Sequence, residues 1–213
     1  MLRSDLKTKA YICTAIGASF AGCLGVTSTS GPGLALKSEA IGLAMIAELP
    51  LVVIDVQRGG PSTGMPTKSE QADLMQALYG RNGESPVVVL AASTPTDCFD
   101  MAYWAGKLAV EHMTPVILLT DAFIANGSAA WRIPDYLNDY PEIRPNYVEN
   151  YRNPEPWKAY RRDKESLVRY WAVPGTENFT QSAPYPPKRP PLHRTAGGDR
   201  KNQPDDRDRK SVV

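Results

Sequence analysis

The feature that most constrains the fold is a regular alternation between short, mostly apolar runs and longer amphipathic segments. The apolar runs are bounded by Gly, Pro and polar turn residues, and they lie at 25–29, 51–56, 86–92 and 115–120. Runs of this length and bounding predict buried strands. Strands that alternate with amphipathic helices pair in parallel through right-handed crossovers. We therefore expect an α/β fold, an open and mainly parallel sheet with helices on both faces.

Four amphipathic segments lie before and between these runs. The second is expected to open at the turn 30–33 and to close at Pro50. The third is expected to begin at Thr67, because Thr67 and Glu70 match a capping box, and to stop at Gly80. The fourth is expected to start at 94–97. The expected apolar faces are Ile12, Ile16, Phe20 and Cys23 for the first helix, Leu36, Ala40, Leu43, Ala44 and Ala47 for the second, and Met101, Ala105, Leu108, Ala109 and His112 for the fourth.

The two ends of the chain do not show this regularity. We expect a polar, charged segment at 1–9, an α/β domain at 10–130, an extended Tyr- and Pro-rich arm at 131–180 and a disordered tail at 181–213. An irregular stretch as long as the arm is unusual inside a compact domain. The arm is therefore expected to lie over its own domain or over a partner, with a short helix near 164–170.

Composition excludes several classes of function. The net charge of +1 gives no electrostatic reason to expect nucleic acid as a partner. Three cysteines without a C-x-x-C pair and two histidines do not favour a metal site or a disulfide framework within the chain. The uncharged stretch 10–26 superficially resembles a secretory signal, but its Gly, Thr and Ser residues make it poorly hydrophobic. We expect the three cysteines to be reduced thiols in the core, and we expect no membrane association and a cytoplasmic protein.

The expected binding region is the carboxyl edge of the sheet, where open α/β folds place their ligands. That edge carries 30–33, 58–67, Ser93 and Asp121. Arg58 follows a strand and precedes two glycines, so it favours an anion such as a carboxylate, although it could also be a surface ion-pair residue. The hydroxyls of Thr63 and Thr67 could help to hold such a group, or serve only as a turn former and a helix N-cap. Asp121 could simply cap the loop after its strand.

Two motifs compete for this loop. Gly59 and Gly64 satisfy G-x-x-x-x-G, but Met65 stands where a phosphate-binding loop needs Lys, and no G-x-G-x-x-G opens a helix. The string 60–64 matches the nucleophile elbow G-x-S-x-G of serine hydrolases around Ser62, with Asp97 or Asp100 and then His112 following in order. The long loop, Pro66 just after the elbow and the position of His112 inside a helix count against that alternative.

The string RGGPSTGMPTKSEQ, preceded by GASFAG and GVTSTSGPGLALKSEAIGLAMIAELPLVVIDVQ, resembles the α subunit of 2-oxoacid:ferredoxin oxidoreductases, the 2-oxoglutarate branch in particular. The resemblance covers about 10–179 and implies a thiamine-pyrimidine-binding domain. It implies an enzyme that oxidatively decarboxylates 2-oxoglutarate to succinyl-CoA and passes electrons to ferredoxin. It also implies thiamine diphosphate and Mg²⁺ shared with a β subunit, with a [4Fe-4S] cluster and coenzyme A in the full complex.

The same resemblance implies roles for particular residues. Arg58 matches the arginine that binds the substrate carboxylate, and Thr63 and Thr67 match hydroxyls that place the substrate. The turn Thr29, Ser30 and Gly31 matches the segment near the pyrimidine ring. The glutamate that activates the aminopyrimidine should fall at Leu6, so no catalytic acid is expected in this chain.

Two further departures from the family shape the expectation. Residues 1–9 do not match the family, and a Y-P-I-T-P-S/T loop is missing. We therefore expect a truncated or chimeric α subunit that is inactive alone. Its rivals are a serine hydrolase using Ser62 and a non-catalytic fragment that docks onto a partner through its aromatic arm.

Overall fold

The structure is a computed structural model, and it describes residues 2–135, 138–151 and 156–177. Four strands form one sheet in the order β1-β2-β4-β3, and all neighbouring pairs are parallel. The elements are α1 Leu2–Phe20, β1 Gly25–Thr29, α2 Gly31–Ile46, β2 Leu51–Gln57, α3 Leu74–Tyr79, β3 Val88–Ala91, α4 Asp97–His112, β4 Pro115–Asp121, α5 Ala122–Asn126 and the 3-10 turn η1 Val148–Asn150. The expected α/β class and the parallel pairing are confirmed, and all four strands form within the runs that the sequence predicts or one residue beyond them.

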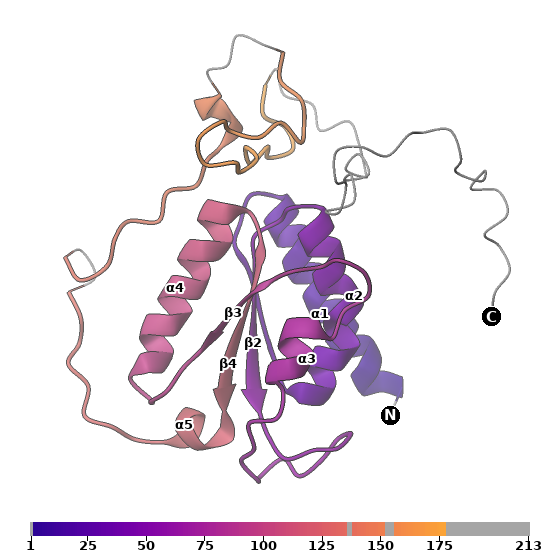
Figure 1. The fold of residues 1–213 in the computed structure, drawn as a ribbon, viewed down its shortest axis with the longest axis vertical. Coiled ribbons are helices and arrows are strands. Elements are labelled where there is room, and N and C mark those ends of the chain that lie inside the picture. Colours follow the sequence, from indigo (N-terminus) through magenta and orange to yellow (C-terminus); the bar gives the residue numbers. More distant parts are fainter. Residues whose placement is uncertain (1, 136–137, 152–155, 178–213) are drawn as a thin grey trace, which may run out of the picture.

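The two central strands divide the core into two layers, because successive side chains of a strand point to opposite faces. On one face Leu51, Val53, Ile117 and Leu119 pack against α1, α2 and α3. On the other face Val52, Val116 and Leu118 pack against Ala105 and Ala109 of α4. Figure 1 shows α1 and α2 on one side of the sheet and α4 on the other. Helices therefore cover both faces, as expected.

The buried sides of the first two helices differ in part from the expected ones. In α1 the buried positions are Ile12, Ala15, Ile16 and Ser19, whereas Phe20 and Cys23 are exposed. In α2 they are Leu34, Lys37, Ala40, Ile41 and Ala44, and Leu36 and Leu43 are exposed. A helix buries positions i, i+3, i+4 and i+7, so choosing the wrong starting residue shifts part of the predicted stripe out of the core.

The helix predicted to begin at Thr67 is wrong at its start. Helix α3 begins at Leu74, although it ends at Gly80 as expected. Thr67 lies in a turn that the bond from the Lys68 N–H to the Met65 carbonyl closes at 3.0 Å. The Glu70 carboxylate, which the capping box would direct to Thr67, instead accepts a hydrogen bond from the Gly60 N–H at 2.9 Å. Loop contacts therefore replace the capping box.

The later part of the arm, 147–151 and 156–177, folds back onto its own domain, at the edge of the sheet where β2 and β4 begin (Figure 1). Trp171 and Val168 pack against Val110 and Met113, and the Trp171 Nε1–H donates to the Ser19 carbonyl at 3.1 Å. The helix expected near 164–170 is wrong. Asp163 instead accepts hydrogen bonds from the backbone and the hydroxyl of Ser166, which forms a turn. The tail expected to be disordered at 181–213 lies outside the described residues.

Candidate functional site

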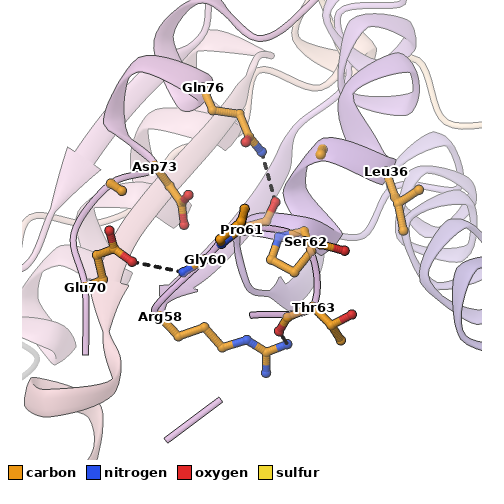
Figure 2. Close-up of a pocket in the computed structure, with 13 residues that line it drawn as sticks. Leu36, Arg58, Gly60, Pro61, Ser62, Thr63, Glu70, Asp73 and Gln76 are labelled. Carbon is orange, nitrogen blue, oxygen red and sulfur yellow. Dashed lines mark hydrogen bonds between the residues drawn. The ribbon is translucent and has the colours of Figure 1, made fainter. Parts of the chain in front are cut away.

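A pocket of about 1000 Å³ opens at the carboxyl edge of β1 and β2 (Figure 2). It lies between the beginning of α2, the loop that follows β2 and the first turn of α3. Its lining residues are Gly31, Pro32, Ala35, Leu36, Arg58, Gly60, Pro61, Ser62, Thr63, Glu70, Ala72, Asp73 and Gln76. The pocket therefore forms where the sequence predicts a ligand site, and several of its walls come from residues that the loop motif does not include.

The loop after β2 is held closed by backbone hydrogen bonds around Gly59. The Gly59 N–H donates to the Lys68 carbonyl at 2.7 Å, and the Met65 N–H donates to the Gly59 carbonyl at 2.8 Å. This closure brings Gly64 so near that a Cβ there would lie 1.9 Å from the Gly59 oxygen, and its φ of +61° also favours glycine. The loop is therefore a folded rim for the pocket.

Arg58 lines the pocket with only part of its hydrogen-bonding capacity used. Its Nη2 donates to the backbone carbonyl of Thr63 at 3.2 Å, as Figure 2 shows. Its Nε is buried and has no hydrogen-bond partner among the described residues. A buried N–H without a partner is costly, so a planar anion that accepts from the guanidinium would remove that cost.

The structure brings Thr63 to Arg58 but keeps Thr67 apart from them. Thr63 lines the pocket and is linked to Arg58 through its carbonyl, and its side chain is exposed. Thr67 is exposed in the turn beyond Met65 and does not line the pocket. The substrate-binding roles of all three residues stay predictions.

The turn at Ser30 and Gly31, expected near a pyrimidine ring, forms another wall. Ser30 is the N-cap of α2, and Gly31 begins the helix and lines the pocket. The Gln76 side-chain amide donates to the Gly31 carbonyl at 3.0 Å (Figure 2). A Cβ on Gly31 would lie 2.6 Å from each carboxyl oxygen of Asp73, so only glycine lets α3 pack this closely. Thr29 ends β1 just before the turn.

Three ionisable groups lie together beneath the pocket. Asp55 of β2 is fully buried, and Lys37 of α2 is 1% exposed. Burial, reinforced by the neighbouring Asp73, raises the pKa of Asp55 to about 7, although Lys37 acts in the opposite direction. Burial also lowers the pKa of Lys37, partly offset by Asp55. The pKa of Asp73 is raised, chiefly by burial.

Sequence reasoning misses this buried group. Treating 51–56 as an apolar run passes over Asp55, and Lys37 looks like one more polar residue of an amphipathic helix. A usable signal does exist for Asp55, because a carboxylate inside an otherwise apolar, fully buried strand is rarely tolerated without a partner. No comparable local signal exists for Asp73, Gln76 and Glu70. The helix predicted to begin at Thr67 gives no indication that these residues lie near the turn at Ser30 and Gly31.

Asp121 caps the segment that follows β4, which is the structural role that the sequence allows for it. Its Oδ1 accepts from the N–H groups of Phe123 and Ile124 at 2.7 and 3.1 Å, and these bonds begin α5. Its Oδ2 accepts from the Gln71 side-chain amide at 2.6 Å. Gln71, near the end of the pocket loop, is thereby bonded to the end of β4.

The serine hydrolase alternative is wrong. Ser62 follows the carboxyl end of β2, whereas His112 ends α4 just before β4 begins. Because the strands are parallel, these residues lie at opposite edges of the sheet (Figure 1). Asp97 accepts hydrogen bonds from Ser93, and Asp100 accepts from the Tyr140 hydroxyl. No charge relay can connect groups so arranged.

Residues 2–135, 138–151 and 156–177 contain neither a metal-binding cluster nor a membrane-spanning helix. No group of three or more His, Cys, Asp or Glu side chains there is arranged to hold a metal ion. No helix there combines the length and the apolar character needed to cross a membrane.

Comparison with known proteins identifies the family. The model described as "Pyruvate flavodoxin/ferredoxin oxidoreductase, thiamine diP-bdg" matches residues 9–182. The chain belongs to this family. The domain described above is therefore the thiamine diphosphate-binding domain of a pyruvate flavodoxin/ferredoxin oxidoreductase relative, and the resemblance stated from the loop motif is confirmed.

Individual relatives point to the 2-oxoglutarate branch. The chain is 62% identical over 165 residues to the 2-oxoglutarate oxidoreductase subunit KorA of Mycobacterium tuberculosis, which covers 78% of this chain and 25% of the relative. It is 40% identical over 145 residues to the 2-oxoglutarate synthase subunit KorA of Archaeoglobus fulgidus, which covers 67% of this chain and 42% of the relative. The chain thus spans between 25% and 42% of the length of these two proteins.

A solved structure shares the fold. The 2-oxoglutarate:ferredoxin oxidoreductase from Magnetococcus marinus, with 2-oxoglutarate, coenzyme A and succinyl-CoA bound, superposes with a TM-score of 0.75 at 39% identity. The match covers 81% of this chain and 29% of that chain. The similarity therefore extends over most of the described domain.

Proposed function

We propose that this chain supplies the pyrimidine-binding and substrate-binding part of a thiamine diphosphate-dependent 2-oxoacid:ferredoxin oxidoreductase α subunit, with 2-oxoglutarate as the substrate. The observation that carries the proposal is Arg58, whose buried Nε lacks a partner among the described residues, in a pocket that Gly31 also lines. The family match and the names of the relatives support the same reaction class.

The residues present fit both ligands. The pocket, about 1000 Å³, is within the usual size range of small-molecule sites. At one wall, Ser30 and Gly31 would hold the pyrimidine ring, next to Thr29. At the loop, the Arg58 guanidinium would donate to the substrate carboxylate in a planar, charge-assisted pair, with the Thr63 hydroxyl beside it. Thr67 would need the loop to move if it is to reach the same ligand.

When bound, thiamine diphosphate supplies a carbon nucleophile for the keto group of the oxoacid, and it accepts the electron pair that decarboxylation leaves. The contribution of this chain is to bind and orient. Arg58 fixes the carboxylate, and the loop closed around Gly59 restricts the directions from which substrate can enter. No residue of this chain is assigned as the catalytic acid, because Leu6 occupies the expected position and is 66% exposed on α1.

The rest of the site is assigned to partners. A β subunit would provide the diphosphate and Mg²⁺ ligands and the [4Fe-4S] cluster, coenzyme A would take the acyl group, and ferredoxin would take the electrons. We expect the isolated chain to be inactive, and thiamine-dependent decarboxylation by the chain alone would contradict this.

The test is 2-oxoglutarate binding to the chain in complex with its β subunit and thiamine diphosphate, measured by isothermal titration calorimetry. Arg58→Ala should weaken binding by about 10- to 150-fold, because a charge-assisted hydrogen bond is worth about 1.5–3 kcal/mol. Arg58→Lys should recover only part of the affinity, since lysine cannot bind in a bidentate manner.

The matched control is Arg144→Ala, which removes an exposed arginine of the arm whose side chain is paired with Glu142. It should leave 2-oxoglutarate binding unchanged. Equal losses in both variants, or none in Arg58→Ala, would remove Arg58 from the site. A non-catalytic docking role through the arm is less favoured, because the described arm buries Trp171 and Val168 against its own domain.

A further inference from the structure

The least satisfied groups in the described part of the chain lie just below the pocket. Asp55 is fully buried, yet neither of its carboxyl oxygens has a hydrogen-bond partner among the described residues. Its backbone pairs with Thr29 on β1 and with Leu119 on β4, so it lies at the centre of the sheet near the carboxyl edge. A buried carboxylate without a donor is among the least favourable arrangements a protein can contain.

Lys37 is the nearest cation, but it does not satisfy Asp55 directly. Its Nζ donates to the Thr27 hydroxyl at 3.2 Å and to the Ser28 carbonyl at 2.9 Å. It acts on Asp55 only through its charge. The buried group therefore contains one positive charge, which can be balanced by one negative charge.

The group that faces Asp55 across the gap is another carboxyl. Asp73, the N-cap of α3, lies within hydrogen-bonding reach of Asp55, and its Oδ2 is buried with no other partner among the described residues. Two ionised carboxylates can only accept, so they cannot bond to each other. With one proton between them they form a short O–H···O bond, as carboxyl dyads in enzymes do.

We propose that Asp55 and Asp73 share a single proton, and that this bond makes Asp73 a positioning residue that holds α3 against the Ser30–Gly31 turn. With one proton shared, the group of Lys37, Asp55 and Asp73 is neutral overall, which removes the largest cost of burying it. The importance of the turn for a ligand rests on the proposed function, but the proton-sharing bond itself does not.

The position of Asp73 explains how the bond reaches the pocket. Its carboxyl oxygens lie where a Cβ on Gly31 would have to be, and its N–H donates to the Gln57 side chain at 3.0 Å. Gln76, one turn further along α3, donates to the Gly31 carbonyl. If the proton is lost, repulsion between the two carboxylates pushes Asp73 off the turn and loosens both contacts.

Two charged groups beside the pair, Lys37 and Glu70, act on it in opposite directions. Burial raises the pKa of Asp55 and of Asp73, the charge of Lys37 opposes the rise at Asp55, and Glu70 raises the pKa of Asp73 further. The shared proton is therefore held until about neutral pH, well above the range of an ordinary aspartate.

The test uses the full chain labelled with ¹³C at the aspartate carboxyl carbons. NMR titration should show Asp55 and Asp73 titrating as a coupled pair, with one transition near neutral pH. Asp55→Asn replaces the shared proton by a permanent amide donor and should abolish that transition. Both carboxyls titrating independently near pH 4 would overturn the proposal.

Hydrogen exchange at the amide of Asp73 reports the positioning role. After correction for intrinsic rates, exchange should accelerate about tenfold between about pH 7 and pH 8 in the wild type and stay flat in Asp55→Asn. Glu70→Gln should keep the acceleration but move it to lower pH, because Glu70 raises the pKa of Asp73. Identical profiles in wild type and Asp55→Asn would show that Asp73 is not held by a proton.

Thiamine diphosphate binding by the complex with the β subunit, at about pH 6 and pH 8, separates the two proposals. A coupled titration with no cofactor binding at either pH would leave the carboxyl pair standing and contradict the proposed function. Binding that is independent of pH, with the NMR transition present, would show that the pair shares a proton without positioning the turn.

Discussion

Replacing Asp55 by asparagine should change how the stability of this domain depends on pH. The folded protein holds a proton on Asp55 at pH values where the unfolded chain has released it, because burial raises the pKa from 3.8 to about 7. The folded state therefore binds more protons than the unfolded state in that interval. Its unfolding free energy must fall as pH rises through the interval and become level above about 7.

The magnitude follows from the size of that interval. One extra bound proton lowers the unfolding free energy by about 1.4 kcal/mol per pH unit, so the loss between pH 5 and pH 7 should be about 2–3 kcal/mol. This is a large share of the roughly 5–15 kcal/mol that stabilises a typical domain. Asp55→Asn cannot bind the proton, so its curve should lack this slope. Losing the attraction to Lys37 shifts the unfolding free energy of Asp55→Asn by the same amount at every pH, so it does not change the slope.

Urea denaturation at several pH values from about 5 to 8 measures both curves by linear extrapolation. Asp139→Asn, at an exposed aspartate whose Oδ2 accepts from the Asp135 N–H, is the control and should keep the wild-type slope. The difference between wild type and Asp55→Asn is the decisive quantity, since other titrating groups cancel. Parallel curves for these two proteins would refute the reasoning.

Three further changes test other parts of the structure. Gly31→Ala forces a Cβ to within 2.6 Å of the Asp73 carboxyl, so it should weaken thiamine diphosphate binding by at least about tenfold, measured by calorimetry with the β subunit. Trp171→Ala should lower the urea-derived unfolding free energy by about 3–5 kcal/mol through the lost packing and the lost bond to Ser19, without altering the Asp55 titration. The Ser166 backbone hydrogen bond is the main reason that the pKa of Asp163 is lowered to about 2, so the stabilisation from Asp163 is present above about pH 4 and is lost as pH falls toward 2. Asp163→Asn should therefore make the unfolding free energy less dependent on pH in this acid range. An unchanged pH dependence would count against the turn.

The sheet could be predicted from the sequence because its signals are local. β1 and β4 form from β-branched or apolar runs that have turn residues at both ends. β2 and β4 carry apolar side chains on both faces, so helices must cover each face of the sheet. The position of Arg58 follows from the same logic, since the residue after a parallel strand lies at the carboxyl edge. These features need no knowledge of long-range contacts.

The rest of the site depends on contacts between residues distant in sequence. The start of α3 is set by bonds from the loop to Gly59 and Gly60, which a capping-box pattern cannot reveal. The pairing of Asp55 with Asp73 requires β2 and α3 to meet, and neither residue has a motif of its own. The cofactor and the partner subunit could be predicted only from the family resemblance of the loop string, because similarity to a family carries information about tertiary structure that periodicity does not.

The contacts of 156–171 at the far edge of the sheet have a consequence for how variation in this domain should be interpreted. Trp171 reaches the end of α1, and Arg169 donates to the Ala47 carbonyl just after α2 at 2.9 Å. Substitutions there would shorten the lifetime of the protein in a cell and lower its abundance, while each surviving molecule kept its affinity for ligand. A loss of cellular function caused by substitutions in this segment would therefore reflect a lower amount of folded protein, and raising expression would correct it.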